Sequence, residues 1–171
     1  MLDIGANQEV KAYLGLGSNT GNREANLAQA LRMLPDQVVV NKVSSIYESE
    51  PVGFKNQPWF LNAVCSASTD LNPQKLLDYV KHIESQLGRA LSFRNAPRPI
   101  DVDILFYGNV VLHSKNLIIP HPRLAERAFV LHPLSEINPL LFHPLKGNTI
   151  GQLLIALTDH EKVRKRKWSP I

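Results

Sequence analysis

Apolar residues in this chain alternate with polar or small residues in several short segments, which is the two-residue period of a half-buried strand. The segments that fit this pattern or are rich in β-branched residues are 10–17 (VKAYLGLG), 38–40, 43–47, 59–68 (WFLNAVCSAS) and 100–107. The second and third are so close together that they predict one bent strand or two short ones. Residues 50–58 are rich in turn-forming residues and predict a loop.

Two further segments have apolar residues at the three- and four-residue spacing of amphipathic helices. The first covers residues 23–34, where Asn22 precedes the helix as its cap and a proline follows it. The second begins at Asn72-Pro73, a cap followed by proline at the first helical position, and ends at Gly88. Its apolar stripe consists of Leu76, Leu77, Val80, Ile83 and Leu87.

The order of elements through residue 107 is β-α-β-β-α-β. This order predicts an α+β fold of the ferredoxin-like type, an antiparallel sheet with two helices on one face. Beyond it lie a Pro-His-Pro turn at 120–122, a short helical piece, an apolar run from Phe129 and a last helix near 149–158. We expect this C-terminal extension to cover the other face or an edge of the sheet. Residues 1–171 would form a single domain with its core over about 10–160.

Composition narrows the class of protein. The chain has 171 residues, of which 44% are hydrophobic and 20% charged, as in ordinary globular domains. A single cysteine excludes an internal disulfide, the N-terminus lacks a signal-peptide pattern, and no window is apolar enough to span a membrane. These features predict a cytoplasmic protein. The net charge of +4 comes largely from lysines and arginines at 162–167, which we interpret as part of a solvated basic tail over 161–171.

The strand predicted over 100–107 contains two carboxylates. Asp101 and Asp103 are two residues apart and therefore point to one face, opposite the strand's isoleucines and valine. Adjacent carboxylates repel each other unless a cation lies between them, and Mg²⁺ prefers one or two carboxylates together with substrate phosphates. The same alternation fits an edge strand whose polar face is in water. The pattern by itself leaves both interpretations open.

Arginines directly before this strand favour the metal interpretation. Arg89, Arg94 and Arg98 lie in a segment stiffened by Pro97 and Pro99. Guanidinium groups beside acids form salt bridges, but together with a metal they also stabilise the charge that develops in phosphoryl transfer. The combination predicts a nucleotide polyphosphate as a substrate.

Two other patterns are weaker candidates for a site. The segment GLGSNTG at 15–21 has neither the GK[ST] ending of a Walker loop nor the spacing of GxGxxG, so we interpret it as a strand-ending turn. His-Pro pairs recur at His121, His132 and His143. Because they lack the close pairing of metal ligands, they favour turns over a zinc site.

The segment RNAPRPIDVDILFYG at 94–108 resembles the signature of the 6-hydroxymethyl-7,8-dihydropterin pyrophosphokinases, a family of folate biosynthesis. Further segments are similar to that family in the same order: YLGLGSNTGN at 13–22, YESEPVG at 47–53, QPWFLNAV at 57–64, IESQLGR at 83–89 and IPHPRLAERAFVL at 119–131. The resemblance covers residues 10 to about 145. It implies transfer of the diphosphoryl group of ATP to the hydroxymethyl oxygen of the pterin, with release of AMP.

The resemblance also implies residue roles. Asp101 and Asp103 would hold two magnesium ions that bridge the ATP phosphates, and with Arg89 and Arg98 they would be the catalytic residues. The residues implied to contact ATP are Glu84, Arg94, Arg98, His121 and Arg127. Those implied to bind the pterin are the ring pair Phe60 and Phe129, the edge-binding Asn62, and Ser49, Pro51 and Val52 of the loop that reads the pterin amide groups. Such a transfer relies on positioning and charge, so no strong base is required.

Four positions depart from the family pattern in the loop before the aspartates. Ala96 replaces a usual glycine, Pro99 a common threonine, Asn95 a tryptophan of some members and Leu91 an arginine of some members. We therefore expect this loop to be stiffer or differently bent.

Two other classes of function fit parts of the sequence. A nucleotidyl cyclase or polymerase would divide its metal acids between two strands, and we find no second acidic strand pair. An RNA-binding module of this topology would use the basic run KVRKRKW at 162–168 but would need RNP1-like aromatic residues, which are missing. The sequence therefore predicts a magnesium-dependent pterin pyrophosphokinase that acts on small molecules, without a nucleic-acid, membrane or obligate protein partner.

Overall fold

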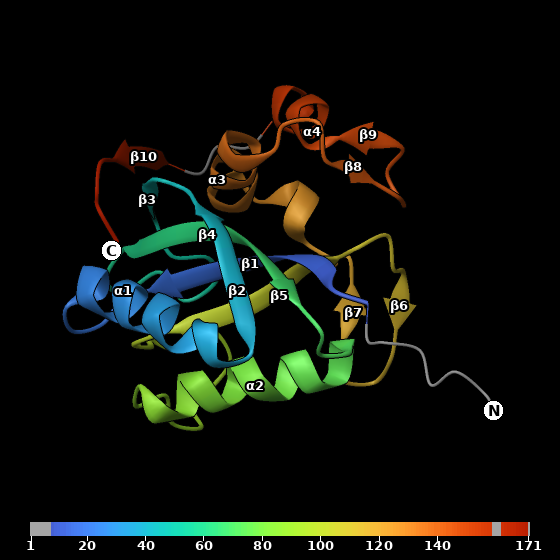
Figure 1. The fold of residues 1–171 in the computed structure, drawn as a ribbon. Helices are drawn as coiled ribbons and strands as arrows, with labels where there is room; N and C mark the ends of the chain where they lie inside the picture. The colour runs from blue at the N-terminus through green and yellow to red at the C-terminus, as the bar shows by residue number, and fades with distance from the viewer. Residues whose placement is uncertain (1–7, 159–161, 171) are drawn as a thin grey trace.

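A six-stranded antiparallel sheet forms the centre of the computed structural model, which describes residues 8–158 and 162–170 (Figure 1). The strand order is β10-β3-β4-β1-β5, and β2 pairs with β4 beside β3. The strands are β1 (Val10–Ser18), β2 (Val38–Val43), β3 (Ile46–Ser49), β4 (Phe60–Thr69), β5 (Asp101–Tyr107) and β10 (Val163–Arg166). The segments 38–40 and 43–47 thus belong to two short strands that share β4 as a partner, one of the two arrangements predicted.

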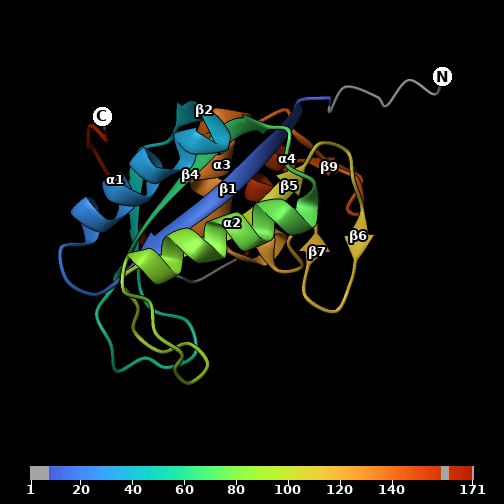
Figure 2. The same ribbon diagram turned by 60° about the horizontal axis from the view of Figure 1, so that its bottom comes forward.

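Two helices cover one face of the sheet, α1 (Arg23–Met33) and α2 (Pro73–Gln86) (Figure 2). Both predicted caps are confirmed: Asn22 accepts a hydrogen bond from the Ala25 amide at 3.0 Å, and Asn72 accepts one from the Lys75 amide at 2.9 Å. Gly88 follows α2 with φ +89°, the left-handed conformation that glycine adopts without strain. With the strand order, these helices confirm the ferredoxin-like α+β fold.

The helices of the C-terminal extension cover the opposite face, as expected, whereas its first hairpin packs on the α1–α2 side. Its elements are the short hairpin β6 (Leu112–His113) with β7 (Ile118–Ile119), the 3₁₀ turn Leu124–Glu126, α3 (Ala128–Ile137), the hairpin β8 (Phe142–His143) with β9 (Asn148–Thr149), and α4 (Ile150–Ala156). A further 3₁₀ turn, Leu34–Asp36, follows α1. The sheet is therefore buried on both faces, with one apolar cluster under α1 and α2 and a second under α3 and α4.

The face of β5 that packs into the first cluster is the one that alternation predicts. Ile100 just before β5, and Val102 and Ile104 within it, are at most 3% exposed. The alternation breaks after Leu105, because Leu14 of β1 pairs with Ile104 and Tyr13 with Phe106, and Phe106 faces the second cluster as Leu105 does. Leu105 is the extra residue of this bulge and belongs to the second cluster, so β5 contributes to both cores.

The basic segment is not a solvated tail over its whole length, so this expectation is wrong. Val163–Arg166 forms β10, which pairs antiparallel with β3 and extends the sheet by one strand. Trp168 packs against the first apolar cluster and donates a hydrogen bond to the Ser44 carbonyl at 3.0 Å. VRKR lacks the apolar alternation of a core strand, and its cations contact acidic groups and aromatic rings instead of a core.

The remaining expectations concern the His-Pro pairs, a membrane span and a signal peptide. The three His-Pro histidines are dispersed: His121 reaches Asp103 at 4.0 Å, His132 stacks on Tyr47 and His143 contacts Phe106 edge-on. Within the described ranges, no helix is both long and apolar enough to cross a membrane. The N-terminal residues 1–7, on which the signal-peptide prediction rests in part, lie outside the described residues.

The cap of α2 gives a test of the fold. Asn72→Ala removes the side-chain acceptor for the Lys75 amide, so we expect the free energy of unfolding to fall by about 1 kcal/mol. For a chain of this length the melting temperature should drop by about 2–4 °C in a thermal scan followed by circular dichroism. Gln86→Ala at the exposed end of the same helix is the control, with an expected change within about 0.5 kcal/mol. Equal melting temperatures for the two variants would contradict the capping role.

Candidate active site

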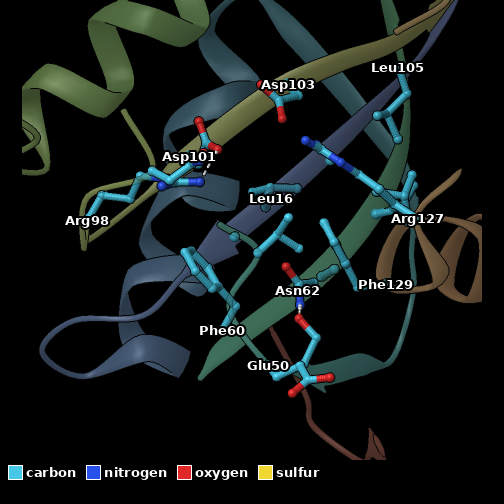
Figure 3. A pocket seen from close by; sticks show the side chains of 18 residues that line it. Leu16, Glu50, Phe60, Asn62, Arg98, Asp101, Asp103, Leu105, Arg127 and Phe129 are labelled. Carbon is cyan, nitrogen blue, oxygen red and sulfur yellow. Dashed lines mark hydrogen bonds and ion pairs between the residues drawn. The ribbon is translucent and has the colours of Figure 1, made fainter. Parts of the chain in front are cut away.

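A cleft opens on the α3 side of the sheet, between the last residues of β1, the first residues of β5 and the loop after β3 (Figure 3). Its lining includes Ser49, Phe60, Asn62, Asp101, Asp103 and Phe129. One side of the cleft is aromatic and the other is charged.

Asp101 stands at the charged side and is held by two arginines. Its Oδ1 contacts Nη1 of Arg89 and its Oδ2 lies 3.2 Å from Nη2 of Arg98. Burial opposes ionisation of this carboxyl, but the guanidinium groups of Arg98 and Arg89 outweigh burial and hold its pKa below the usual range. Asp101 is therefore a fixed negative charge.

Asp103 lies on the same face of β5 in a different electrostatic setting. Burial and the neighbouring Asp101 carboxylate raise its pKa to about 7. Its side chain is still 35% exposed and points into the cleft, where Figure 3 shows Arg127 reaching toward it from the far wall. The pair therefore combines a carboxylate held by two arginines with one for which the described residues show no ion pair to a lysine or arginine.

His121 approaches this pair from the other side, with Nε2 4.0 Å from Asp103 Oδ2. Its Nδ1 accepts a hydrogen bond from the Arg123 amide at 3.2 Å, which leaves Nε2 directed at the aspartate. Burial and the nearby Arg127 charge lower the pKa of His121 to about 4. At neutral pH the imidazole is therefore uncharged, and because Nδ1 accepts, its proton is on Nε2, where it can be donated to a bound group.

Glu84 of α2 organises the charged side from beneath. It is buried, and its Oε1 accepts from the Val102 amide at 2.7 Å while its Oε2 lies 2.9 Å from Nη1 of Arg89. Lys81 Nζ also contacts Oε1 at 2.8 Å. Both oxygens are thus engaged by protein groups, so the contacts in hand show a residue that fixes Arg89 and β5. Its contact with ATP stays a prediction.

Arg98 is positioned by its backbone as well as its side chain. Its amide donates to Oδ1 of Asn19 at 2.9 Å, and its carbonyl accepts from the Asn19 amide at 3.2 Å. Its guanidinium lies 4.9 Å from the centre of the Phe60 ring. Sequence reasoning missed this role of Asn19, which it interpreted only as part of the turn after β1. The side chain of Asn19 is buried and fixes the arginine loop in place.

The aromatic side of the cleft has the predicted residues. Phe60 and Phe129 lie on opposite sides of the cavity, and Asn62 forms its floor between them (Figure 3). Asn62 donates through Nδ2 to the Tyr47 carbonyl at 3.0 Å and to Ser49 Oγ at 2.9 Å. Its side-chain oxygen has no protein donor among the described residues and faces the cavity near Gly17, so it is available as an acceptor.

A second cleft adjoins the first across β5. Asp103 and His121 line it together with the cations Lys81 and Lys115. Asp103 is thus shared by two clefts, one aromatic and one cationic. A group bound in one cleft can therefore meet a group bound in the other at the Asp103 carboxylate.

The donor set fits a hard divalent cation. Asp101 and Asp103 present carboxylate oxygens from one strand face, and their mutual repulsion is relieved by a cation between them. Within residues 8–158 and 162–170, no group of three or more histidine, cysteine, aspartate or glutamate side chains is placed to hold a metal. An all-protein cage is therefore not the pattern. Magnesium bound by one or two carboxylates, with ligand phosphates and water completing its shell, matches these residues.

A comparison with protein families places the chain as a whole. Residues 13–139 match the family model described as 7,8-dihydro-6-hydroxymethylpterin-pyrophosphokinase. The chain belongs to this pyrophosphokinase family. The match spans both clefts and all residues for which a site role was predicted.

Two relatives of similar length are also named as pterin pyrophosphokinases. The 2-amino-4-hydroxy-6-hydroxymethyldihydropteridine pyrophosphokinase of Bacillus subtilis is 48% identical over 128 residues, which is 74% of this chain and 77% of the relative. The enzyme of that name in Aquifex aeolicus is 45% identical over 133 residues, 78% of this chain and 83% of the relative.

Other relatives are much longer. The folic acid synthesis protein fol1 of Pneumocystis carinii is 45% identical over 150 residues, but the chain covers only 20% of it. Among solved structures, the Plasmodium falciparum HPPK-DHPS protein with pterin and p-hydroxybenzoate superposes with a TM-score of 0.72 at 18% identity, over 90% of this chain and 42% of that one. At that identity the likeness supports the fold alone. The chain therefore corresponds to one part of these larger proteins.

Some residues predicted from the pyrophosphokinase pattern do not line the aromatic cleft. Pro51 is buried in the loop after β3, whereas its neighbours Glu50 and Val52 line the cleft. Sequence reasoning missed Glu50, which had no chemical signal beyond its position in the matched segment YESEPVG. Arg94 is exposed and lines a separate cleft formed by the arginine loop, together with Arg89 and Arg98.

The positions that depart from the family pattern shape that loop. Ala96 is buried, and its carbonyl accepts from Nη1 of Arg98 at 2.9 Å. Asn95 has φ +61°, a left-handed conformation that asparagine tolerates, and its carbonyl accepts from Gln57 Nε2 at 2.9 Å. Leu91 is fully exposed and contributes nothing to either substrate cleft.

The contrasting carboxylates predict opposite effects of amide substitution on stability. In metal-free buffer above pH 7, Asp103→Asn should raise the free energy of unfolding by about 1 kcal/mol, or about 2–4 °C in melting temperature, a figure kept low because a third of the side chain is exposed. Asp101→Asn should lower it, because two arginines lose their partner. Thermal scans with a chelator would measure both.

The pH dependence of the stability gained by Asp103→Asn tests whether charge repulsion is its cause. The folded protein holds a proton on Asp103 up to about pH 7, whereas the unfolded chain releases it near pH 4, so the raised pKa costs stability as pH rises through this window. The advantage of Asp103→Asn should therefore be largest above pH 7 and vanish toward pH 4. A gain that is equal at both ends would show that charge repulsion is not its source.

Proposed function

We propose that this chain transfers the diphosphoryl group of ATP to the hydroxymethyl oxygen of 6-hydroxymethyl-7,8-dihydropterin and releases AMP. The observation that carries the proposal is that Asp103 lines both an aromatic cleft and a cationic cleft, with Asp101 beside it in the aromatic one. A flat heterocycle suits the first cleft and a polyphosphate the second. Family membership supports the same reaction.

In this proposal the pterin ring lies between Phe60 and Phe129. The free Oδ1 of Asn62 accepts from the ring's amide or amino edge, since Nδ2 is already committed to Tyr47 and Ser49. This orientation aims the hydroxymethyl group at the aspartates. Its oxygen attacks the β-phosphorus, the bond from that phosphorus to the α,β-bridging oxygen breaks, and AMP leaves, while the hydroxyl proton passes to solvent.

The charge of the transferred group is met from several sides. Two magnesium ions held by Asp101 and Asp103 would neutralise the phosphate oxygens and orient the β-phosphorus. Arg98 lies between Asp101 and the Phe60 ring, so it adjoins both substrates. Arg89, Arg127 and neutral His121 supply further donors around the same pair, in a setting where positioning and charge compensation account for catalysis. A cytoplasmic location stays a prediction.

The product distribution tests the reaction class. With ATP, magnesium and 6-hydroxymethyl-7,8-dihydropterin, AMP should accumulate in a one-to-one ratio with the pterin diphosphate, as measured by chromatography. Removal of magnesium with a chelator should abolish turnover, and added magnesium should restore it. Formation of ADP in place of AMP would refute diphosphoryl transfer.

The aspartates provide the matching variants. Asp101→Ala or Asp103→Ala should each lower kcat by about 10³-fold or more, because the metal and the phosphate charge lose their anchor. Circular dichroism should show a retained fold. Asp78→Ala on the exposed surface of α2 is the control. Near-normal turnover in either active-site variant would exclude the metal assignment.

The aromatic pair tests the substrate assignment of the clefts. Phe129→Ala should raise KM for the pterin by about tenfold or more, since one ring face loses an aromatic contact worth about 0.5–1.5 kcal/mol in addition to buried area. The KM for ATP should change little. Phe142→Ala, which removes an exposed ring from β8, is the control in the same steady-state assay. A larger effect on ATP than on pterin would reverse the assignment.

A further inference from the structure

The basic strand β10 is the feature that the proposed function leaves unexplained. It lies along the outer edge of β3, with Val163 opposite Ser49 and Arg166 opposite Ile46 (Figure 1). On its other side β3 pairs with β4 over only three residue pairs, which include Ser49 with Phe60 and Tyr47 with Asn62. A four-residue strand is thus held between β10 and the strand that carries two predicted pterin residues.

The cations of β10 attach to both faces of β3. On the α3 face, Lys165 Nζ lies 3.3 Å from Oε2 of Glu136, which also accepts from the Tyr47 hydroxyl at 2.7 Å. On the α1 face, Arg166 Nη2 lies 3.0 Å from Oε2 of Glu48. The alternation of strand side chains therefore places one ion pair on each side of the sheet.

Each acidic partner extends the connection into the body of the protein. Glu136 belongs to α3 and also accepts from the Ser45 amide at 3.0 Å, just before β3. Glu48 pairs with Arg23 of α1 at 3.1 Å, and Arg23 in turn donates to the Trp59 carbonyl at 2.8 Å, next to Phe60. Through these contacts β10 joins β3 to both helical layers.

Both ends of this strand also attach to the chain around β3. The Lys162 amide donates to Oε1 of Glu50, which lines the aromatic cleft, at 3.2 Å. At the other end Trp168 donates to the Ser44 carbonyl. The cations of β10 contact acidic groups and an aromatic ring within the protein: Lys165 and Arg166 pair with glutamates, and Arg164 lies 5.4 Å from the centre of the Trp59 ring. These internal contacts do not favour an RNA-binding role.

We propose that β10 is a positioning element for the pterin, in which Lys165 and Arg166 fix β3 and thereby the Ser49, Glu50 and Asn62 side of the cleft. This inference rests on the proposed function. Neither cation lines the cleft, so both act through β3. The sheet order separates β3 from β5 by two strands, so the aspartates and the cationic cleft are remote from β10. Loss of the two ion pairs should therefore weaken pterin binding and leave ATP binding unchanged.

The test is the double variant Lys165→Gln/Arg166→Gln in the full chain. Both cations are at least half exposed, so their combined contribution is modest. KM for 6-hydroxymethyl-7,8-dihydropterin should rise about three- to tenfold, the range expected for one or two such pairs, whereas KM for ATP and kcat should stay within about twofold. The charge-conserving variant Lys165→Arg/Arg166→Lys should restore the pterin KM.

Two controls separate positioning from general stability. Lys167→Gln removes the next cation along the chain, for which the described residues show no ion pair, and should leave the pterin KM unchanged. Asn72→Ala, which destabilises the distant helix α2, should also leave it unchanged. In addition, raising NaCl from about 0.05 to about 0.5 M should increase the pterin KM of the unsubstituted chain more than that of the double variant, because salt screens exposed ion pairs.

The outcomes distinguish this inference from the proposed function. If the unsubstituted chain releases no AMP from ATP and the pterin, the proposed function fails. If the chain is active but the double variant matches Lys167→Gln, or loses affinity equally for both substrates, the positioning role of β10 is overturned. Isothermal titration with the pterin in the presence of a non-hydrolysable ATP analogue would give the same comparison without turnover.

Discussion

Two carboxylates on one face of β5 impose the constraint around which the site is built. Like charges at this spacing repel each other, and partial burial increases the cost. Among the described residues, Arg98 and Arg89 neutralise the charge of Asp101 and hold it ionised. Asp103 has no such pair of arginines, and its pKa rises to about 7. A metal ion that carries a polyphosphate would relieve the remaining repulsion between the two carboxylates. The same repulsion thus lowers the folding stability of the metal-free protein and favours binding of a cation.

The surrounding elements can be understood as supports for this pair. Buried Glu84 fixes Arg89 and the start of β5 from α2. Asn19, at the end of β1, holds the backbone of Arg98 in place by reciprocal hydrogen bonds. The apolar residues of β5 pack under the same helices, so the core and the charged side share one strand. A change in the packing of α2 would therefore be transmitted to the arginines without any contact with substrate.

The sheet order separates the two halves of the site. The aspartates lie on β5 at one edge, whereas Ser49 lies on β3 near the other, with β4 and β1 between them. Each half has its own external support, α2 for the charged side and β10 for the aromatic side. This arrangement allows binding of the heterocycle and management of phosphate charge to be tuned independently. It also gives the basic C-terminal segment a part in the architecture through its ion pairs with Glu48 and Glu136.

The sequence by itself determined the β-α-β-β-α-β order, the helix caps at Asn22 and Asn72, and the shared face of Asp101 and Asp103, because period, capping chemistry and strand alternation are local properties. Only the tertiary structure decided that the apolar run after Phe129 is a helix over the second face, since a short apolar run fits either element. It alone showed that Asn19 holds Arg98 and that VRKR is a strand. Those roles depend on partners such as Glu48 and Glu136, which are far away in the chain, and no local pattern records them.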